Sequence, residues 1–434
     1  MIIRRPSFLL YITLIVLTFA AISPAQRPSA TPRQEKLLNG LKVLVWHTPG
    51  AEKATVRLRI HAGSSFDPQD KEGVMQLLAE SFFPNPDSRS FFRDELGGSF
   101  DLICNYDYIQ INASASNDSL LTLLDTLAQA LANPDLSKEA TASLKTSLLE
   151  RIKDAEKDGA YIADRAIAKR LFGAFPYGRP GLGTTQSVEK IDFADLRFAR
   201  NRLLTADNAT LAISGDIDRS LALRAARRYF GSWAKSDKRV PSTFRQPEAP
   251  DAAVVKVEMP GLANSEVRYA IRGESRASKD FAAAEIFARV LNARLSERVS
   301  AASGSNASVT HDAHILPGAF VFRYRSEPSS PLLLSADSSN ATPLSFHSLL
   351  GRPITEAEFA AARDQVLAGL GSRNVMDQWL DVDTFRITSV ADDTKAFQNT
   401  TLADVNSLST RLTREPLAAA VVTVPPVAAS NTSN

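Results

Sequence analysis

The sequence predicts an α+β protein of two similar domains, each a mainly antiparallel twisted sheet with helices packed on one face. Segments of alternating apolar residues are followed by longer segments with helical spacing, and this order occurs twice. A polar stretch with three prolines, residues 234–253, separates the two occurrences and is interpreted as a linker. The 434 residues, 44% of them hydrophobic, are enough for two sizeable cores.

The first domain, residues 33–233, begins with a hairpin. Asn39 and Gly40 supply its turn, and the alternation from Lys42 to Trp46 supplies its second strand. Apolar spacing predicts the remaining elements. We expect strands at 54–65, 101–111 and 208–218, and helices at 76–83, 120–134, 137–158 and 219–233.

The second domain, residues 254–427, repeats the pattern. A Thr-x-x-Glu capping box, Thr355 to Glu358, marks the start of one of its helices. Residues 428–434 are small and polar and are expected to form a disordered tail. We expect strands at 254–261, 265–273 and 318–326, and helices at 280–299 and 355–370.

The N-terminus has the composition of an export signal. Arg4 and Arg5 precede an uncharged run from Ser7 to Ile22, and a small-x-small pattern ends at Ala25. We therefore predict a cleaved signal peptide at residues 1–25. The alternative is an uncleaved anchor, but the run is short against the roughly 20 residues that span a bilayer. No later run is long and apolar enough, so we expect no membrane contact after cleavage.

Charge and cysteine content narrow the functional classes. The formal net charge is +2, from 50 basic and 48 acidic residues, and no basic run is interleaved with aromatic residues. A nucleic-acid partner is therefore not expected. Cys104 is the only cysteine, so it forms no internal disulfide and builds no thiolate zinc site. We interpret it as a small buried hydrophobic residue.

The segment 73–83, GVMQLLAESFF, predicts the first turns of a buried helix. Gln76, Ala79 and Glu80 are spaced i, i+3 and i+4, so they share one face of it. The simplest interpretation of this face is an ordinary polar and partly solvated helix surface.

Several segments, in the same order along the chain, resemble the pitrilysin/insulinase family of zinc metallopeptidases, which includes the mitochondrial processing peptidases. Residues 37–45, LLNGLKVLV, are similar to the family's opening hairpin, and residues 59–80 to its strand, Gly-Ser turn and zinc helix. Residues 92–111 resemble its helix, double-glycine turn and strand. The most specific match is 175–218, with Pro-Tyr-Gly, Gly-x-Gly-Thr and Gly-Asp-Ile-Asp in the family order.

The resemblance implies where a zinc site would lie. Active members carry His-x-x-Glu-His on the helix and a further Glu roughly seventy residues later; the two His and the distant Glu hold zinc, and the Glu between the His acts as general base. The two His positions fall on Gln76 and Glu80, and the base falls on Ala79. The distant Glu falls on Arg151 or, with a shift of one residue, on Glu150.

The residues at these positions do not support the family's chemistry. Gln76 is a neutral and poor zinc ligand, and Ala79 accepts no proton. Glu80 with Glu150 makes at most a two-carboxylate site, whereas catalytic zinc usually has three protein ligands. If Arg151 holds the fourth position, we expect it to pair with Glu80. We therefore predict a degenerate site that holds no metal, with no catalytic residue and no cofactor.

Two histidines offer a weaker metal signal. His311 and His314 form the only close pair in the sequence, HDAH, without a companion carboxylate motif. The segment is interpreted as a strand, in which residues i and i+3 point to opposite faces. Metal binding at this pair is therefore the less favoured interpretation.

The resemblance also implies a substrate contact in the second domain. Family members often carry there an Arg and a Tyr that contact substrate backbone opposite the zinc. Arg298 falls on the Arg position and Asn306 on the Tyr position. We predict these two as substrate-binding residues, although Arg298 fits equally well as a surface cation at a helix end.

The combined prediction is an exported, catalytically inactive homologue of this family. We expect it to be the non-catalytic subunit that completes the peptide-binding chamber of a zinc-bearing homologous partner, holding peptides by adding them as a strand to a sheet edge. A bacterial periplasm is the expected compartment. One alternative is a residual metal-dependent endopeptidase that acts on short peptides. The other is a structural scaffold subunit of an envelope complex.

Overall fold

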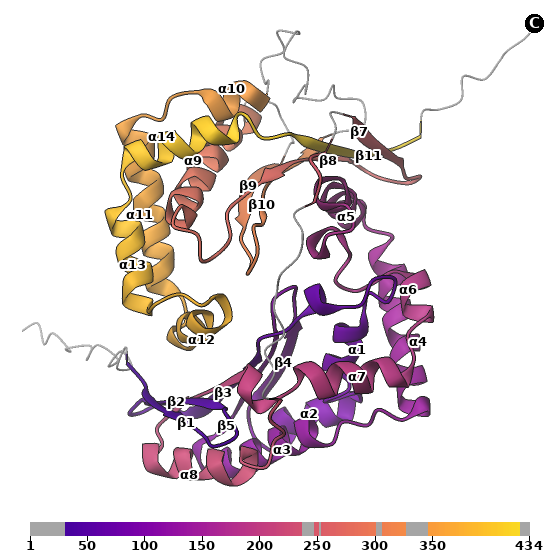
Figure 1. Cartoon of the computed structure of the whole chain (residues 1–434), viewed down its shortest axis with the longest axis vertical. Helices are drawn as coiled ribbons and strands as arrows, with labels where there is room; N and C mark the ends of the chain where they lie inside the picture. Colours follow the sequence, from indigo (N-terminus) through magenta and orange to yellow (C-terminus); the bar gives the residue numbers. More distant parts are fainter. Residues whose placement is uncertain (1–30, 237–246, 251–252, 301–305, 327–345, 426–434) are drawn as a thin grey trace, which may run out of the picture.

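The computed structural model describes residues 31–236, 247–250, 253–300, 306–326 and 346–425. The two halves of the chain form two domains that lie one above the other (Figure 1). Each domain contains one sheet. The first sheet is made of β1 (Arg33–Lys36), β2 (Lys42–His47), β3 (Lys53–Ile60), β4 (Ser99–Cys104), β5 (Ile109–Ser116) and β6 (Ala209–Gly215). The second is made of β7 (Val254–Glu258), β8 (Ser265–Arg272), β9 (Asn306–Asp312), β10 (Ala319–Ser326) and β11 (Ala418–Thr423).

The two sheets share one topology. Their strand orders are β1-β2-β6-β3-β5-β4 and β7-β11-β8-β10-β9. Apart from the added β1, each sheet places its first strand parallel to its last strand and then continues antiparallel through the second, fourth and third. The predicted fold of two similar, mainly antiparallel domains is confirmed. The predicted hairpin is β1 and β2, and Gly40 supports its turn with a φ of +90°.

Helices of each domain cover the outer face of its own sheet. On β3 the alternating residues Val56, Leu58 and Ile60 are fully buried beneath the helices of the first domain, as their pattern predicts. The first domain has α1 (Val74–Glu80), α2 (Pro86–Asp94), α3 (Leu120–Ala132), α4 (Lys138–Ala155), α6 (Thr185–Glu189), α7 (Phe193–Leu203) and α8 (Arg219–Phe230). The second has α9 (Phe281–Ser300), α10 (Phe346–Gly351), α11 (Glu356–Ser372), α13 (Val390–Asn399) and α14 (Leu402–Leu412).

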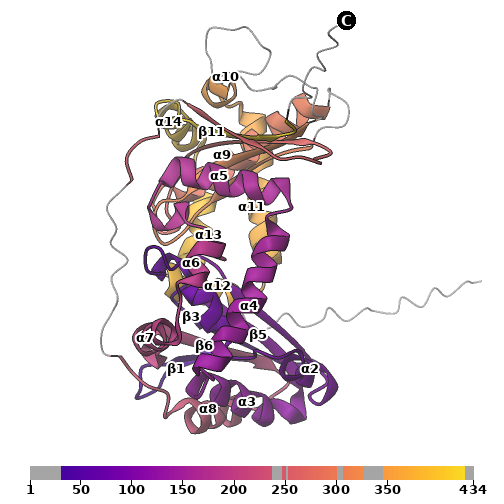
Figure 2. The ribbon, with the colours of Figure 1, turned by 90° about the vertical axis from the view of Figure 1, so that its right-hand side faces the viewer.

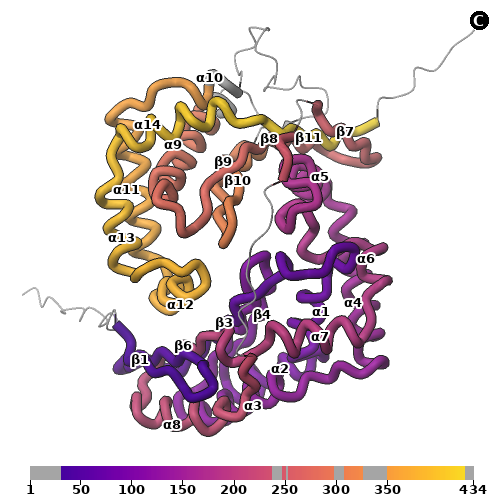
Figure 3. The backbone as a smooth tube through the Cα atoms, in the orientation of Figure 1, coloured from indigo at the N-terminus to yellow at the C-terminus, as the bar shows by residue number. Residues whose placement is uncertain are grey.

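The inner face of each sheet is covered by a helix from the other domain. Helix α5 (Gly159–Phe172) belongs to the first half of the chain but packs on β8 and β11 of the second sheet (Figure 2). Its apolar residues meet alanines such as Ala270 and Ala420, whose small side chains let the helix approach closely. In the reverse direction, Met376 and Leu380 of α12 (Val375–Phe385) pack on the first sheet. The tube in Figure 3 shows both crossings.

Charged side chains reinforce this exchange of helices. On β3, Arg59 is 2% exposed; it donates to Asp381 of α12 (2.7 Å) and to Gln110 of β5 (2.6 Å). On β8, Arg268 donates to Asp164 of α5 (2.6 Å). Each sheet thus holds the helix of the other domain by an arginine–aspartate pair as well as by apolar contacts.

Three further predictions concern segments that lie wholly or partly outside the described residues. The signal peptide at residues 1–25 and the tail at 428–434 lie outside the described residues. Of the linker at 234–253, the described residues 234–236, 247–250 and 253 belong to no helix or strand. None of the described helices is both long and apolar enough to cross a membrane.

Candidate functional site

Helix α1 is held firmly at its start. It follows Gly73, whose φ of +107° lies in the left-handed region. The carboxylate of Asp67 accepts hydrogen bonds from the backbone N–H groups of Gly73 (2.8 Å) and Met75 (2.7 Å), donors that a helix leaves free at its start. Burial raises the pKa of Asp67 to about 7, and the two N–H groups oppose this rise. The helix therefore presents a fixed face to the interior.

The predicted face of α1 is present. Gln76 is half-buried, Ala79 is fully buried and Glu80 is 5% exposed. The side-chain amide of Gln76 donates from Nε2 to Oε1 of Glu80 over 2.6 Å, as the i and i+4 spacing allows. The methyl group of Ala79 offers no atom that can take up a proton.

The structure brings Arg151, and not Glu150, to this face. Arg151 lies on α4 and donates from Nη1 to Oε1 of Glu80, so the expected ion pair is present. Its side chain remains 46% exposed, while that of Glu80 is 7% exposed. Glu150, one position earlier on α4, is exposed. We call Gln76, Ala79, Glu80 and Arg151 together the α1 site.

The residues of the α1 site do not fit a zinc ion. A guanidinium already compensates the one carboxylate, and a dication would have to displace it against their mutual attraction. Gln76 offers only a neutral amide oxygen. Across the described part of the chain, no group of three or more His, Cys, Asp or Glu side chains is placed to hold a metal.

One residue of the α1 site, Gln76, borders a cleft of about 890 Å³ between α5 and the rest of the first domain. We call it the main cleft. Gln76 lies in its wall, Tyr161 and Arg165 of α5 form the opposite side, and Cys104 and Tyr106 also line it. Cys104 is half-buried rather than fully buried, and burial together with nearby carboxylates raises the pKa of its thiol.

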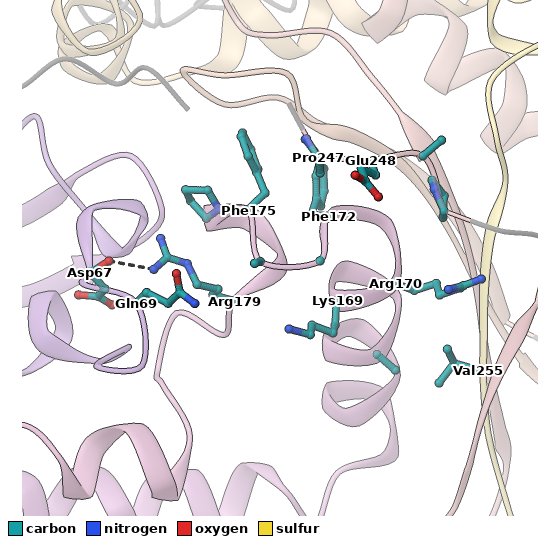
Figure 4. Close-up of a pocket in the computed structure, with 16 residues that line it drawn as sticks. Asp67, Gln69, Lys169, Arg170, Phe172, Phe175, Arg179, Pro247, Glu248 and Val255 are labelled. Atoms are coloured by element: carbon teal, nitrogen blue, oxygen red, sulfur yellow. Dashed lines mark hydrogen bonds between the residues drawn. The ribbon is translucent and has the colours of Figure 1, made fainter. Parts of the chain in front are cut away.

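A second hollow adjoins the main cleft. It measures about 1000 Å³ and is bordered by the end of α5 and by residues 247–250 (Figure 4). Lys169, Arg170 and Arg179 give it a basic rim. Arg179 donates to the backbone oxygen of Asp67 over 2.9 Å, which connects this rim to the start of α1.

The two close histidines do not form a pair. Both ring nitrogens of His311 are hydrogen-bonded. Nδ1 contacts Oε1 of Glu285 (2.9 Å), and Nε2 accepts from the backbone N–H of Glu274 (3.0 Å). His314 contacts buried Asp107 of the first domain (Nδ1 to Oδ2, 2.7 Å). The prediction of one strand through both is wrong, because β9 ends at Asp312 and His314 lies in the following turn. Both rings are structural, and His314 joins the domains.

The predicted substrate residues Arg298 and Asn306 lie near each other in sequence but on different elements. Arg298 is in α9, and Asn306 begins β9, where it pairs with Arg325 of β10. The side chains of both lie outside the described part of the structure. Their role remains a prediction.

Sequence reasoning missed the side of the site that α5 supplies. The segment 159–172 has a helical pattern, but a pattern does not tell which sheet receives the helix. It also missed the buried partners of Arg59. The sequence did contain a signal for these partners. Arg57 and Arg59 alternate with fully buried apolar residues on a central strand, and arginines there indicate that something covers the second face of the sheet and pairs with them.

Comparison with known proteins agrees with the fold described above, two similar α+β domains of a peptidase-like protein. Residues 42–185 match the model of the insulinase family, peptidase family M16, and residues 190–366 match the model of the peptidase M16 inactive domain. The chain belongs to peptidase family M16. The resemblance to the pitrilysin/insulinase family is thereby confirmed.

Two relatives indicate the breadth of this family. An uncharacterized zinc protease of Mycobacterium bovis is 27% identical over 218 residues, 48% of this chain and 49% of the relative. The beta subunit of the mitochondrial-processing peptidase of Saccharomyces cerevisiae is 23% identical over 214 residues, 48% of this chain and 46% of that subunit. The matches span about half the length of these relatives.

Solved structures share the fold over nearly the whole chain. The peptidase M16 inactive domain from Pseudomonas fluorescens has a TM-score of 0.78 at 19% identity, covering 91% of this chain and 98% of that one. The first half of the periplasmic protease PqqL from Escherichia coli has 0.68 at 15% identity, covering 93% and 94%. A chain of Complex III2 from Candida albicans has 0.71 at 17% identity, covering 90% and 95%.

Proposed function

We propose that this chain is a catalytically inactive member of family M16. The observation that carries the proposal is the contact of Arg151 with Glu80 at the position where active members bind zinc. A guanidinium there compensates the charge of Glu80, so a dication would have to displace it before binding that carboxylate. Ala79 also removes the general base, so even a borrowed metal would lack its proton acceptor.

We further propose that the chain completes the peptide chamber of a zinc-bearing homologous subunit. Two observations support this proposal. β4 is the edge strand of the first sheet, and α1, which packs against β4, borders the main cleft through Gln76. An extended peptide added to β4 would gain main-chain hydrogen bonds while its side chains reach the cleft. Peptide binding and catalysis would then be divided between two chains.

Export to a bacterial periplasm belongs to the same proposal. It rests on the signal-like composition of residues 1–25 and on the likeness to the periplasmic protease PqqL. A scaffold role in an envelope complex is the second candidate. The likeness to a chain of Complex III2 favours it.

Zinc analysis of the purified mature chain tests the proposal. We expect below about a tenth of a zinc per chain, because a site with one compensated carboxylate cannot hold the ion. A Glu80→Ala variant serves as the control. Near one zinc per chain, lost in that control and accompanied by peptide cleavage, would contradict the proposal.

Affinity purification separates the two candidate roles. A tagged chain that retains a zinc-bearing M16 homologue, together with metal-dependent cleavage of peptides by the complex, supports the chamber role. Retention of membrane-complex subunits without peptide binding supports the scaffold role.

A further inference from the structure

The contact between Gln76 and Glu80 fixes which way the Gln76 amide points. A carboxylate accepts hydrogen bonds only, so it holds the donor Nε2 at 2.6 Å. The carbonyl Oε1 is consequently turned away from Glu80. Since Gln76 lies in the wall of the main cleft, this oxygen is an available hydrogen-bond acceptor there.

Arg151 supplies the complementary donors. Its guanidinium has five N–H groups, and Nη1 bonds Glu80. The side chain is 46% exposed, so the remaining N–H groups are not enclosed by protein. Glu80 thus orients two neighbours at once and leaves an acceptor on one and donors on the other.

The charges of the α1 site favour a neutral ligand. Glu80 and Arg151 cancel, and Gln76 is uncharged. The lining of the main cleft carries both signs of charge. Four acidic side chains and three basic ones nearly balance there, so the lining favours neither an anionic nor a cationic ligand: Asp70, Glu72, Glu156 and Asp164 against Arg165, Lys169 and Arg179. A neutral group that offers one donor and one acceptor matches what the site presents.

We propose that the former zinc site now recognises a main-chain amide of an extended peptide: the peptide N–H donates to Oε1 of Gln76, and an adjacent peptide carbonyl accepts from Arg151. This inference rests on the proposed peptide-holding function and names the contacts that perform it. Where an active relative would polarise a carbonyl for cleavage, this chain holds the peptide by hydrogen bonds alone and leaves it intact.

Peptide binding to the full mature chain tests the proposal. The probe is an end-blocked, fluorescein-labelled octapeptide without charged side chains, measured by fluorescence polarisation. Gln76→Met keeps the length and helix preference of the side chain but removes both hydrogen-bonding groups. We expect it to weaken binding about fivefold, the effect of one lost hydrogen bond. Gln129→Met is the matched control, because exposed Gln129 on α3 also donates to a carboxylate one turn away, Asp125 (2.9 Å), but lies outside the main cleft; it should leave binding unchanged.

Ester substitution in the peptide identifies the contacted amide. Replacing each peptide N–H in turn by an ester oxygen should weaken binding at the positions that pair with β4 and at one further position. Only the ester at that further position should cost nothing more in Gln76→Met, because its partner is already removed. Arg151→Lys, which keeps a cation beside Glu80, is a second variant expected to weaken binding.

Three outcomes would overturn the inference. If the peptide binds equally well to the unmodified chain and to both variants, the α1 site is not the contact, although the proposed function stands. If a peptide with a free carboxyl terminus binds much better than the blocked one and only this preference is lost in Arg151→Lys, the ligand is a carboxylate. If no peptide binds at all, both the inference and the proposed peptide-holding role fail.

Discussion

Arg151→Leu removes the cation that compensates buried Glu80 and tests the central contact of the α1 site. Glu80 would keep its hydrogen bond from Gln76 but would carry its charge in a site where its side chain is 7% exposed. Removing one partner of a fully buried ion pair costs about 3–5 kcal/mol. An exposed pair is worth at most about 1 kcal/mol. Because Arg151 is 46% exposed, we expect a loss of about 1–2 kcal/mol, between these limits.

Urea unfolding of the mature chain measures this loss. The Glu150→Ala variant is the control, since Glu150 is the exposed neighbour of Arg151 and should change the unfolding free energy little. Making Arg151→Leu in a Glu80→Gln background should remove most of the effect, because no buried charge is then left without a partner. A loss equally large in both backgrounds would refute the reasoning, as would a loss no larger than that of Glu150→Ala.

Three further predictions concern the rest of the fold. Arg59→Met should lower the unfolding free energy in urea by about 1–3 kcal/mol, because Asp381 loses its buried partner and keeps only the half-exposed Arg373. Arg93→Met, at an exposed position, should not move the urea midpoint. Burial lowers the pKa of His61 to about 4, so the unfolded chain binds a proton at a higher pH than the folded chain does. The unfolding free energy should therefore fall as pH drops from about 6.5 to 4. His61→Gln should flatten this part of the profile of stability against pH. Gly73→Ala should lower the thermal midpoint by several degrees, as expected for a loss of about 1–3 kcal/mol. The reason is that Gly73 has a φ of +107° and that an added Cβ would meet Val188. An unchanged midpoint would contradict the role of this glycine.

The sequence predicted the elements that local rules determine. The Asn39–Gly40 turn and the alternating strand after it identified the first hairpin, and the i, i+3 and i+4 spacing identified the face shared by Gln76 and Glu80. These features depend on a few adjacent residues. The choice between Arg151 and Glu150 required the structure, because a shift of one position turns a helical side chain by about 100° and only packing sets the rotation of α4.

The contacts between the domains could not be predicted in the same way. The partners of Arg59 and Arg268 lie on helices far away in the sequence, and alternation on a strand separates two faces without saying what covers each. His314 illustrates the same limit. A strand pattern was expected to continue through it, but β9 ends at Asp312 and the His314 side chain hydrogen-bonds buried Asp107 of the other domain.

The exchange of α5 and α12 has a consequence for how the molecule is assembled during synthesis. When the first half has emerged, Phe172 and its apolar neighbours on α5 have no surface to cover them, and the inner face of the first sheet still lacks α12. Neither half can cover the inner face of its sheet until the other half is made, so the last folding step joins segments as far apart as Arg59 and Asp381, 322 residues along the chain. Until then the nascent chain exposes the apolar face of α5 and the inner face of the first sheet, and both favour aggregation. A chaperone that shields these two faces would therefore raise the yield of folded protein. The same dependence would let two separately made halves recognise each other and rebuild one molecule.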